Sequence, residues 1–86
     1  MEIKSFLCPI TGHIMDEPVL LVGDGHSYEA EAVQQWLQAG NRTSPMTNLE
    51  LSVDQMLCVP NLTLRAAISE FKEQATKKKG GGLAGH

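Results

Sequence analysis

The chain carries only two cysteines, Cys8 and Cys58, in a sequence of 86 residues. Folded units below about 70–80 residues usually need disulfides or a bound metal, because their apolar core is small. Structural zinc takes four Cys or His ligands, commonly in closely spaced pairs. The remaining candidate ligands, His13, His26 and His86, form no such pairs. We therefore expect a fold without metal or other cofactor, held by packing, turns and polar side-chain pairs.

Charge and hydropathy exclude several classes of function. Ten acidic residues against seven basic ones give a net charge of -3, whereas nucleic-acid-binding domains present a basic face to the phosphates. No apolar run approaches the roughly 20 residues that cross a bilayer, and no secretory signal peptide opens the chain. We expect no nucleic-acid or membrane partner, and an intracellular location in the cytoplasm, the nucleus or both.

An apolar stretch broken by a proline, Phe6–Thr11, begins the part that we expect to fold. Proline fixes its own φ angle and keeps the preceding residue extended, so Leu7 and Cys8 cannot begin a helix. The stretch is therefore typical of a stiff loop. Its aliphatic residue after the proline, Ile10, either covers the core or serves as an exposed anchor for a partner protein, and the pattern leaves both open.

A hairpin and a helix are predicted next. Val19–Val22 is an aliphatic run of strand length, and His26–Tyr28 is the candidate return strand across a glycine-rich turn. We expect Ser27 to cap the following helix, which runs through Trp36. This helix should stop at Gly40, because glycine commonly follows the last helical residue.

A second loop and a second helix follow. The polar stretch Asn41–Asn48 contains Pro45, so we expect another stiff loop there. Asn61, directly after a proline, is expected to cap a helix of about four turns. The apolar face of that helix recurs every three or four positions, at Leu64, Ile68 and Phe71.

The chain divides into three segments of unequal length. Residues 1–5 are a short lead-in, and residues 6–76 are expected to fold as one domain. The lysine run at 77–79 should end the last helix, since cations suit the negative end of the helix dipole. The glycine-rich remainder makes 77–86 a flexible basic tail in this interpretation.

In their order along the chain, these features resemble the U-box family. The matching positions lie within about residues 4–74 and are Phe6–Thr11, Met15, Pro18–Val19, Asp24–Gly25, Ser27–Glu29, Trp36, Ser44–Thr47 and Leu57–Asn61, followed by Leu64 and Ile68. Members share a RING-like fold without zinc. The resemblance therefore implies a small α+β domain with two long loops, a short β-hairpin, a central helix and a C-terminal helix.

The function that the resemblance implies is that of a ubiquitin-protein ligase module. Such a module binds a ubiquitin-conjugating enzyme charged with ubiquitin and promotes ubiquitin transfer to a lysine of a protein substrate, which the sequence does not identify. The implied catalysis is positional, because the module holds reactants together. We expect no catalytic side chain and no covalent ubiquitin intermediate on this chain.

In this family, polar side chains replace the metal cross-braces. The bracing residues that the resemblance implies here are Asp24, Glu29, Ser44, Thr47 and Asn61, with Asp16, Glu17 and Arg42 as further members. The sequence does not show which pairs form, and each residue taken singly fits a solvated side chain. Because buried polar groups need hydrogen-bond partners, we expect Ser44, Thr47 and Asn61 to bond to the backbone.

The resemblance also implies a shallow groove for the conjugating enzyme between the two loops and the first helix. Its floor would be Ile10, Trp36 and Pro45, with Leu7 and Met46 at the rim. A few rigid apolar anchors ringed by polar residues are typical of an interface hot spot. The competing interpretation places Ile10 and Trp36 in the core, although Trp36 lies at the edge of the apolar stripe of its helix.

One further position concerns ubiquitin itself. In RING-like ligases a side chain after the second loop, commonly Arg or Lys, often bonds both ubiquitin and its carrier. The matching residue here is Asn48, which can donate and accept hydrogen bonds but is shorter and uncharged. The resemblance therefore makes Asn48 a candidate ubiquitin-bridging residue, which we expect to activate ubiquitin transfer less strongly than an Arg or Lys would.

Two other functions compete with the ligase interpretation. A non-catalytic interaction module or homodimer on the same fold would self-associate without stimulating ubiquitin discharge. A cysteine hydrolase would pair Cys8 with His13 or His26 as its base. A cysteine before proline in an apolar run, however, is typical of a buried small side chain.

Overall fold

The computed structural model describes residues 3–84, with side chains described for residues 3–74. Its elements are η1 (Lys4–Phe6), β1 (Pro18–Leu21), β2 (His26–Glu29), α1 (Ala30–Gln38), η2 (Asp54–Met56), β3 (Cys58–Pro60) and α2 (Leu62–Ala84). Two long connections complete the chain: the first loop, residues 7–17, and the second loop, residues 39–53. The predicted α+β architecture of two loops, hairpin, central helix and C-terminal helix is confirmed.

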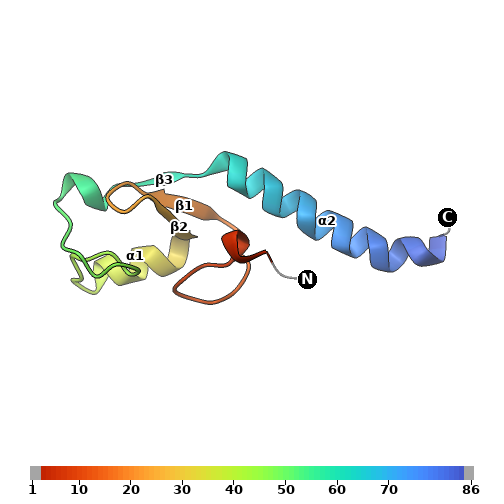
Figure 1. Ribbon diagram of the computed structural model, residues 1–86, viewed down its shortest axis with the longest axis horizontal. Coiled ribbons are helices and arrows are strands. Elements are labelled where there is room, and N and C mark those ends of the chain that lie inside the picture. The colour runs from red at the N-terminus through yellow and green to blue at the C-terminus, as the bar shows by residue number, and fades with distance from the viewer. Residues whose placement is uncertain (1–2, 85–86) are drawn as a thin grey trace.

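The three strands form one antiparallel sheet in the order β2–β1–β3 (Figure 1). In the predicted hairpin, Leu21 pairs with His26 across the turn, and its carbonyl accepts the amides of Asp24 and Gly25. Gly25 has a φ of 72°, a conformation that favours glycine. The third strand, β3, was not predicted as a strand, because three residues ending in a proline are too short to show an alternating pattern.

The core lies between one face of the sheet, α1 and the first turns of α2. Its buried apolar residues are Cys8, Met15, Leu21, Tyr28, Val33, Leu51 and Ile68. Cys8 and Met15 come from the first loop and Leu51 comes from the second, so both loops contribute to the core. Figure 1 shows the two loops beside α1, with α2 extending away from the body.

The cap of α1 differs from the prediction. Ser27 is not the N-cap: strand pairing continues to Glu29, opposite Pro18, and the helix begins only at Ala30. Ser27 instead lies within β2. The other two predicted helix boundaries are confirmed: Gly40 follows α1 with a φ of 95°, and Asn61 Oδ1 accepts the Leu64 amide at 3.2 Å, at the start of α2.

The end of α2 also differs from the prediction. The helix continues through the lysine run to Ala84, because lysine is a good helix former and its charge alone does not stop a helix. The flexibility of residues 77–86 and the domain limits stay predictions, and residues 1–2 and 85–86, including the candidate ligand His86, lie outside the described residues.

Two kinds of feature are absent from the described residues. None of the described helices combines the length and apolar character needed to cross a membrane. Within the same residues, no three His, Cys, Asp or Glu side chains gather closely enough to hold a metal ion.

Candidate functional site

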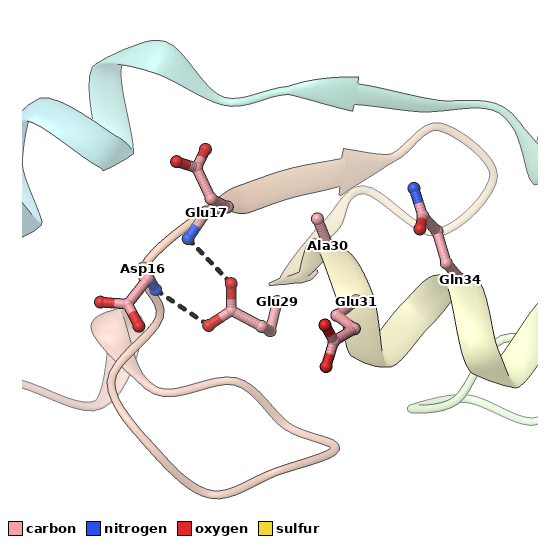
Figure 2. Close-up of a pocket in the computed structure, with 6 residues that line it drawn as sticks. All are labelled: Asp16, Glu17, Glu29, Ala30, Glu31 and Gln34. Atoms are coloured by element: carbon pink, nitrogen blue, oxygen red, sulfur yellow. Dashed lines mark hydrogen bonds between the residues drawn. The ribbon is translucent and has the colours of Figure 1, made fainter.

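A carboxylate at the start of α1 holds the end of the first loop. The two oxygens of Glu29 accept the backbone amides of Asp16 and Glu17 at 2.9 and 2.8 Å (Figure 2). The Glu29 amide in turn donates to the Cys8 sulfur at 3.2 Å. We call Glu29, Asp16, Glu17 and Cys8 the Glu29 brace. It fixes the first loop at two points against the junction of β2 and α1.

A second carboxylate joins the hairpin to the second loop. Asp24 Oδ2 accepts hydrogen bonds from Tyr28 Oη at 2.5 Å and from Ser44 Oγ at 2.6 Å. Its other oxygen accepts the His26 amide at 2.8 Å. We call Asp24, Tyr28 and Ser44 the Asp24 brace. Because Ser44 is twenty positions from Asp24, this brace joins the two segments of the chain that precede and follow α1.

The hydroxyl of Ser44 also organises the tip of the second loop. Ser44 is 1% exposed, and its oxygen accepts the amides of Met46 and Thr47 at 3.1 and 3.0 Å. Thr47 Oγ1 accepts the Leu49 amide at 3.2 Å. The expected bonds of Ser44 and Thr47 to the backbone are therefore present. They leave the proline-containing tip with little freedom.

The protonation states of the Asp24 brace follow from its surroundings. Burial raises the pKa of Asp24, but hydrogen bonds from Ser44, Tyr28 and the His26 amide outweigh burial and hold that pKa below its usual 3.8. Burial and then the hydrogen bond to Asp24 raise the pKa of Tyr28 well above its usual 10. At neutral pH, Asp24 is therefore an ionised acceptor and Tyr28 a protonated donor.

The tryptophan of α1 makes a further contact with the second loop. Trp36 Nε1 donates to the Thr43 carbonyl at 2.7 Å, and the Trp36 carbonyl accepts from Asn41 Nδ2 at 2.9 Å. The indole is half-buried. This agrees with its predicted place at the edge of the apolar stripe, and the bond to Thr43 sets the orientation of the ring relative to the second loop.

The five predicted docking residues are each exposed or half-buried. Ile10 is 38% exposed and Met46 is 50% exposed, while Leu7, Trp36 and Pro45 are half-buried. The interpretation of Ile10 as a core residue is therefore wrong. Leu7 and Met46 line one hollow of about 390 Å³ between the first loop, the hairpin turn, the second loop and α2. Their roles in docking stay predictions.

Asn48, the candidate ubiquitin-bridging residue, is exposed at the end of the second loop's tip. Its φ of 63° is in the left-handed region, which asparagine tolerates better than most residues. Its amide donates to the Ser44 carbonyl at 2.8 Å. The backbone conformation thus gives a structural reason for asparagine at this position, which sequence reasoning missed.

Asn61 links α2 to the hairpin. Its Nδ2 donates to Ser27 Oγ at 3.0 Å, its Oδ1 accepts the Leu64 amide, and its own amide donates to the Pro18 carbonyl at 2.9 Å. The expected bond of Asn61 to the backbone is present, as are those of Ser44 and Thr47.

The further predicted members of the bracing set behave differently from one another. Asp16 and Glu17 form ion pairs with Lys72 and Arg65 of α2. Arg42 is exposed, and its backbone carbonyl accepts an amide of the second loop. The two cations of α2 therefore contact two members of the Glu29 brace at the end of the first loop.

Two residues of the braces were not found from the sequence. Tyr28 lies at the centre of the Asp24 brace, and the Cys8 sulfur belongs to the Glu29 brace. The signal for Tyr28 was available, because a buried tyrosine needs a partner for its hydroxyl and Asp24 is on the same hairpin. The full burial of Cys8 also contradicts the cysteine-hydrolase alternative, which needs an accessible thiol.

Comparison with known proteins gives a consistent result. The U-box domain family matches residues 4–77 of the chain. Over 68 residues, 79% of this chain, it is 52% identical to "Putative U-box domain-containing protein 58" of Arabidopsis thaliana. Over 64 residues, 74% of the chain, it is 56% identical to "WD repeat, SAM and U-box domain-containing protein 1" of Danio rerio.

A third relative extends the match. The chain is 46% identical over 73 residues, 85% of its length, to the Homo sapiens protein that is also called "WD repeat, SAM and U-box domain-containing protein 1". The matched segments span 12–16% of the length of these three relatives. With this family match over most of its residues and an α+β fold held by two polar braces, the chain belongs to the U-box family.

Proposed function

We propose that this chain is a ubiquitin-protein ligase module that binds a ubiquitin-charged conjugating enzyme and promotes transfer of ubiquitin to a substrate lysine. Membership of the U-box family supports this function at the level of the family. The single observation that carries the finer proposal is the pair of polar braces. They hold both loops rigid while Ile10 and Met46 remain exposed beside them.

Rigid loops matter because docking then costs little conformational entropy. Each rotamer-rich side chain or loop that must be ordered on binding lowers the affinity that its contacts supply. In the proposed complex, Ile10, Trp36 and Pro45 form the floor of the docking surface, and Leu7 and Met46 form its rim. In typical interfaces, a small number of such anchors accounts for most of the binding free energy.

The proposed catalysis is positional. The thioester belongs to the conjugating enzyme, and the module restrains the attached ubiquitin so that the thioester carbonyl is held ready for attack by an amine. This chain contributes binding and orientation and forms no covalent bond to ubiquitin. Asn48 is the proposed contact to ubiquitin itself, through its side-chain amide.

The experiment is a discharge assay over a panel of charged conjugating enzymes with free lysine as the acceptor. We expect the wild-type chain to accelerate discharge with at least one of them. Ile10→Ala should reduce the acceleration about tenfold or more, as truncation of a hot-spot anchor does, with the free energy of unfolding changed by less than about 1 kcal/mol.

The matched control is Val53→Ala, since Val53 is also an exposed β-branched residue, and it comes directly before η2 in the chain and is not one of the five predicted docking residues. It should discharge at the wild-type rate. Absence of stimulated discharge with every enzyme, together with concentration-dependent self-association, would instead support the non-catalytic dimerisation module.

A further inference from the structure

The α2 helix contacts both ends of the first loop. At the end of the loop, Arg65 Nη2 lies 3.0 Å from Glu17 Oε1, and Lys72 Nζ pairs with Asp16 Oδ1. Just before its start, in η1, the ring of Phe6 meets the ring of Phe71 edge-on, with centroids 5.4 Å apart and planes at 69°. Ile10 lies on the loop between these two attachments.

Arg65 and Lys72 are on the same face of α2, because positions seven apart are separated by about two turns. Between them, Ile68 is 2% exposed and packs in the core with Met15. The cations, these apolar side chains and Ser69 line a hollow of about 280 Å³ against the end of the first loop. The apolar contact holds α2 against the rest of the fold, and the two ion pairs lie at the exposed edge of that contact.

The backbone of the Asp16–Glu17 pair is bound elsewhere. Both of its amides donate to Glu29, at the start of α1 (Figure 2). Their carboxylates pair with Lys72 and Arg65, so the side chains reach from this anchored backbone to α2. The same two residues join the first loop to α1 through the backbone and to α2 through the carboxylates.

From this arrangement we infer that Arg65 and Lys72 are positioning residues, which hold the first loop in the conformation that docks the conjugating enzyme. The inference rests on the proposed function, since it concerns the same docking surface. The two cations lie on α2, outside the predicted groove, and act on Ile10 through Asp16 and Glu17.

The size of the effect follows from the exposure of the ion pairs. The side chains of Arg65 and Glu17 are 54% and 58% exposed, and those of Lys72 and Asp16 are 44% and 77% exposed. Exposed ion pairs shift an equilibrium by less than about fivefold. The pairs are therefore too weak to decide folding. The apparent affinity scales with the fraction of chains whose first loop is docking-competent, so a factor of this size is the most that loss of a pair can take from the affinity.

The test uses the whole chain and the conjugating enzyme that it discharges best. Lys72→Glu should raise the KM for the charged enzyme, by up to about fivefold, and leave kcat unchanged, because only the docking-competent fraction falls. Lys72→Arg, which keeps the cation, should behave as wild type. The double variant Asp16→Lys with Lys72→Glu restores an ion pair of opposite polarity and should recover the wild-type KM.

A second pair of variants leaves all four ion-pair residues in place. Ser69 is exposed, four positions after Arg65 and three before Lys72, so a carboxylate there competes for both cations. Ser69→Glu should raise KM in the same direction as Lys72→Glu. Ser69→Gln, which has almost the same shape without the charge, should not.

A readout independent of activity separates this inference from the proposed function. Amide hydrogen exchange of residues 7–14, measured by mass spectrometry, should accelerate about two- to fivefold in Lys72→Glu and return to the wild-type rate in the double variant. If wild type discharges no conjugating enzyme, the proposed function fails, while exchange still tests the attachment. Unchanged exchange and unchanged KM in both Lys72→Glu and Ser69→Glu would overturn the inference.

Discussion

Asp24 of the hairpin accepts a hydrogen bond from the buried hydroxyl of Ser44 at 2.6 Å, across twenty positions of sequence. The serine is a donor to the carboxylate and at the same time an acceptor for two amides of the second loop. One hydroxyl therefore fixes both where the loop attaches and how its tip is folded. A metal-bound cross-brace would achieve the same by coordination.

Removal of that hydroxyl should therefore weaken the fold measurably. In Ser44→Ala, the two loop amides and one oxygen of Asp24 lose a partner in a partly buried setting, so the free energy of unfolding should fall by about 1–3 kcal/mol. Chemical denaturation followed by the fluorescence of the single tryptophan measures this. Ser5→Ala, at an exposed serine of η1, is the control and should change it by less than about 0.5 kcal/mol. Similar losses in both variants would contradict the role of Ser44.

Acid should weaken the fold through Asp24. Its pKa in the folded chain is below the 3.8 of an unperturbed aspartate, so the unfolded chain binds a proton first as the pH falls. The contribution of Asp24 is therefore complete above about pH 4 and is lost as the pH falls through the lowered pKa. A titration of the Asp24 side-chain carboxyl by NMR should place its midpoint below 3.8. A midpoint above that value would show that burial outweighs the hydrogen bonds.

Alkali should act on the same brace through its tyrosine. The pKa of Tyr28 is raised in the folded chain, so stability is complete below about pH 10 and falls as the pH rises past that point, where the unfolded chain ionises. Tyr28 is the only tyrosine, so near-ultraviolet absorbance follows its ionisation without interference. We expect no phenolate signal near pH 10 until the chain unfolds. Ionisation at the ordinary pKa in the folded chain would contradict the bond to Asp24.

The Glu29 brace can be weakened with almost no change of shape. In Glu29→Gln, one carboxylate oxygen becomes an amide donor, so either the Asp16 or the Glu17 amide loses its acceptor. The free energy of unfolding should fall by about 1–3 kcal/mol, with faster hydrogen exchange in the first loop. Glu29 and Glu31 line one hollow at the start of α1 (Figure 2), and Glu31 is exposed, so Glu31→Gln is the matched control. Equal effects of the two changes would rule out a special role for Glu29.

Asn48 combines a backbone requirement with a proposed contact to ubiquitin. Asn48→Arg should raise the rate of ubiquitin discharge, because a longer cationic side chain can reach both ubiquitin and its carrier. It should also cost up to about 1–2 kcal/mol of stability, since the φ of 63° disfavours side chains other than asparagine and glycine. Asn48→Gly suits this backbone but lacks the side chain. Equal discharge rates for wild type, Asn48→Arg and Asn48→Gly would remove the bridging role.

The sequence by itself determined the order of elements and the absence of paired metal ligands. Proline and glycine positions mark loops, turns and the end of α1 because they act on the backbone locally, without tertiary contacts. The cap at Asn61 was readable for the same reason. The sequence pattern left open whether Ile10, after Pro9, is buried or exposed, and the structure shows that it is exposed. The list of bracing residues came from the resemblance to a family, and it named residues without naming pairs.

Only the tertiary structure decided which polar groups meet. Asp24 and Ser44, Glu29 and the Asp16 amide, and the α2 cations with the first loop are joined over long stretches of chain. Such pairs depend on how the hairpin, α1 and α2 pack, and packing is a property of the whole chain. The same reason explains why Ser27 does not cap α1: pairing with β1 holds it in a strand, and local preference yields to the sheet.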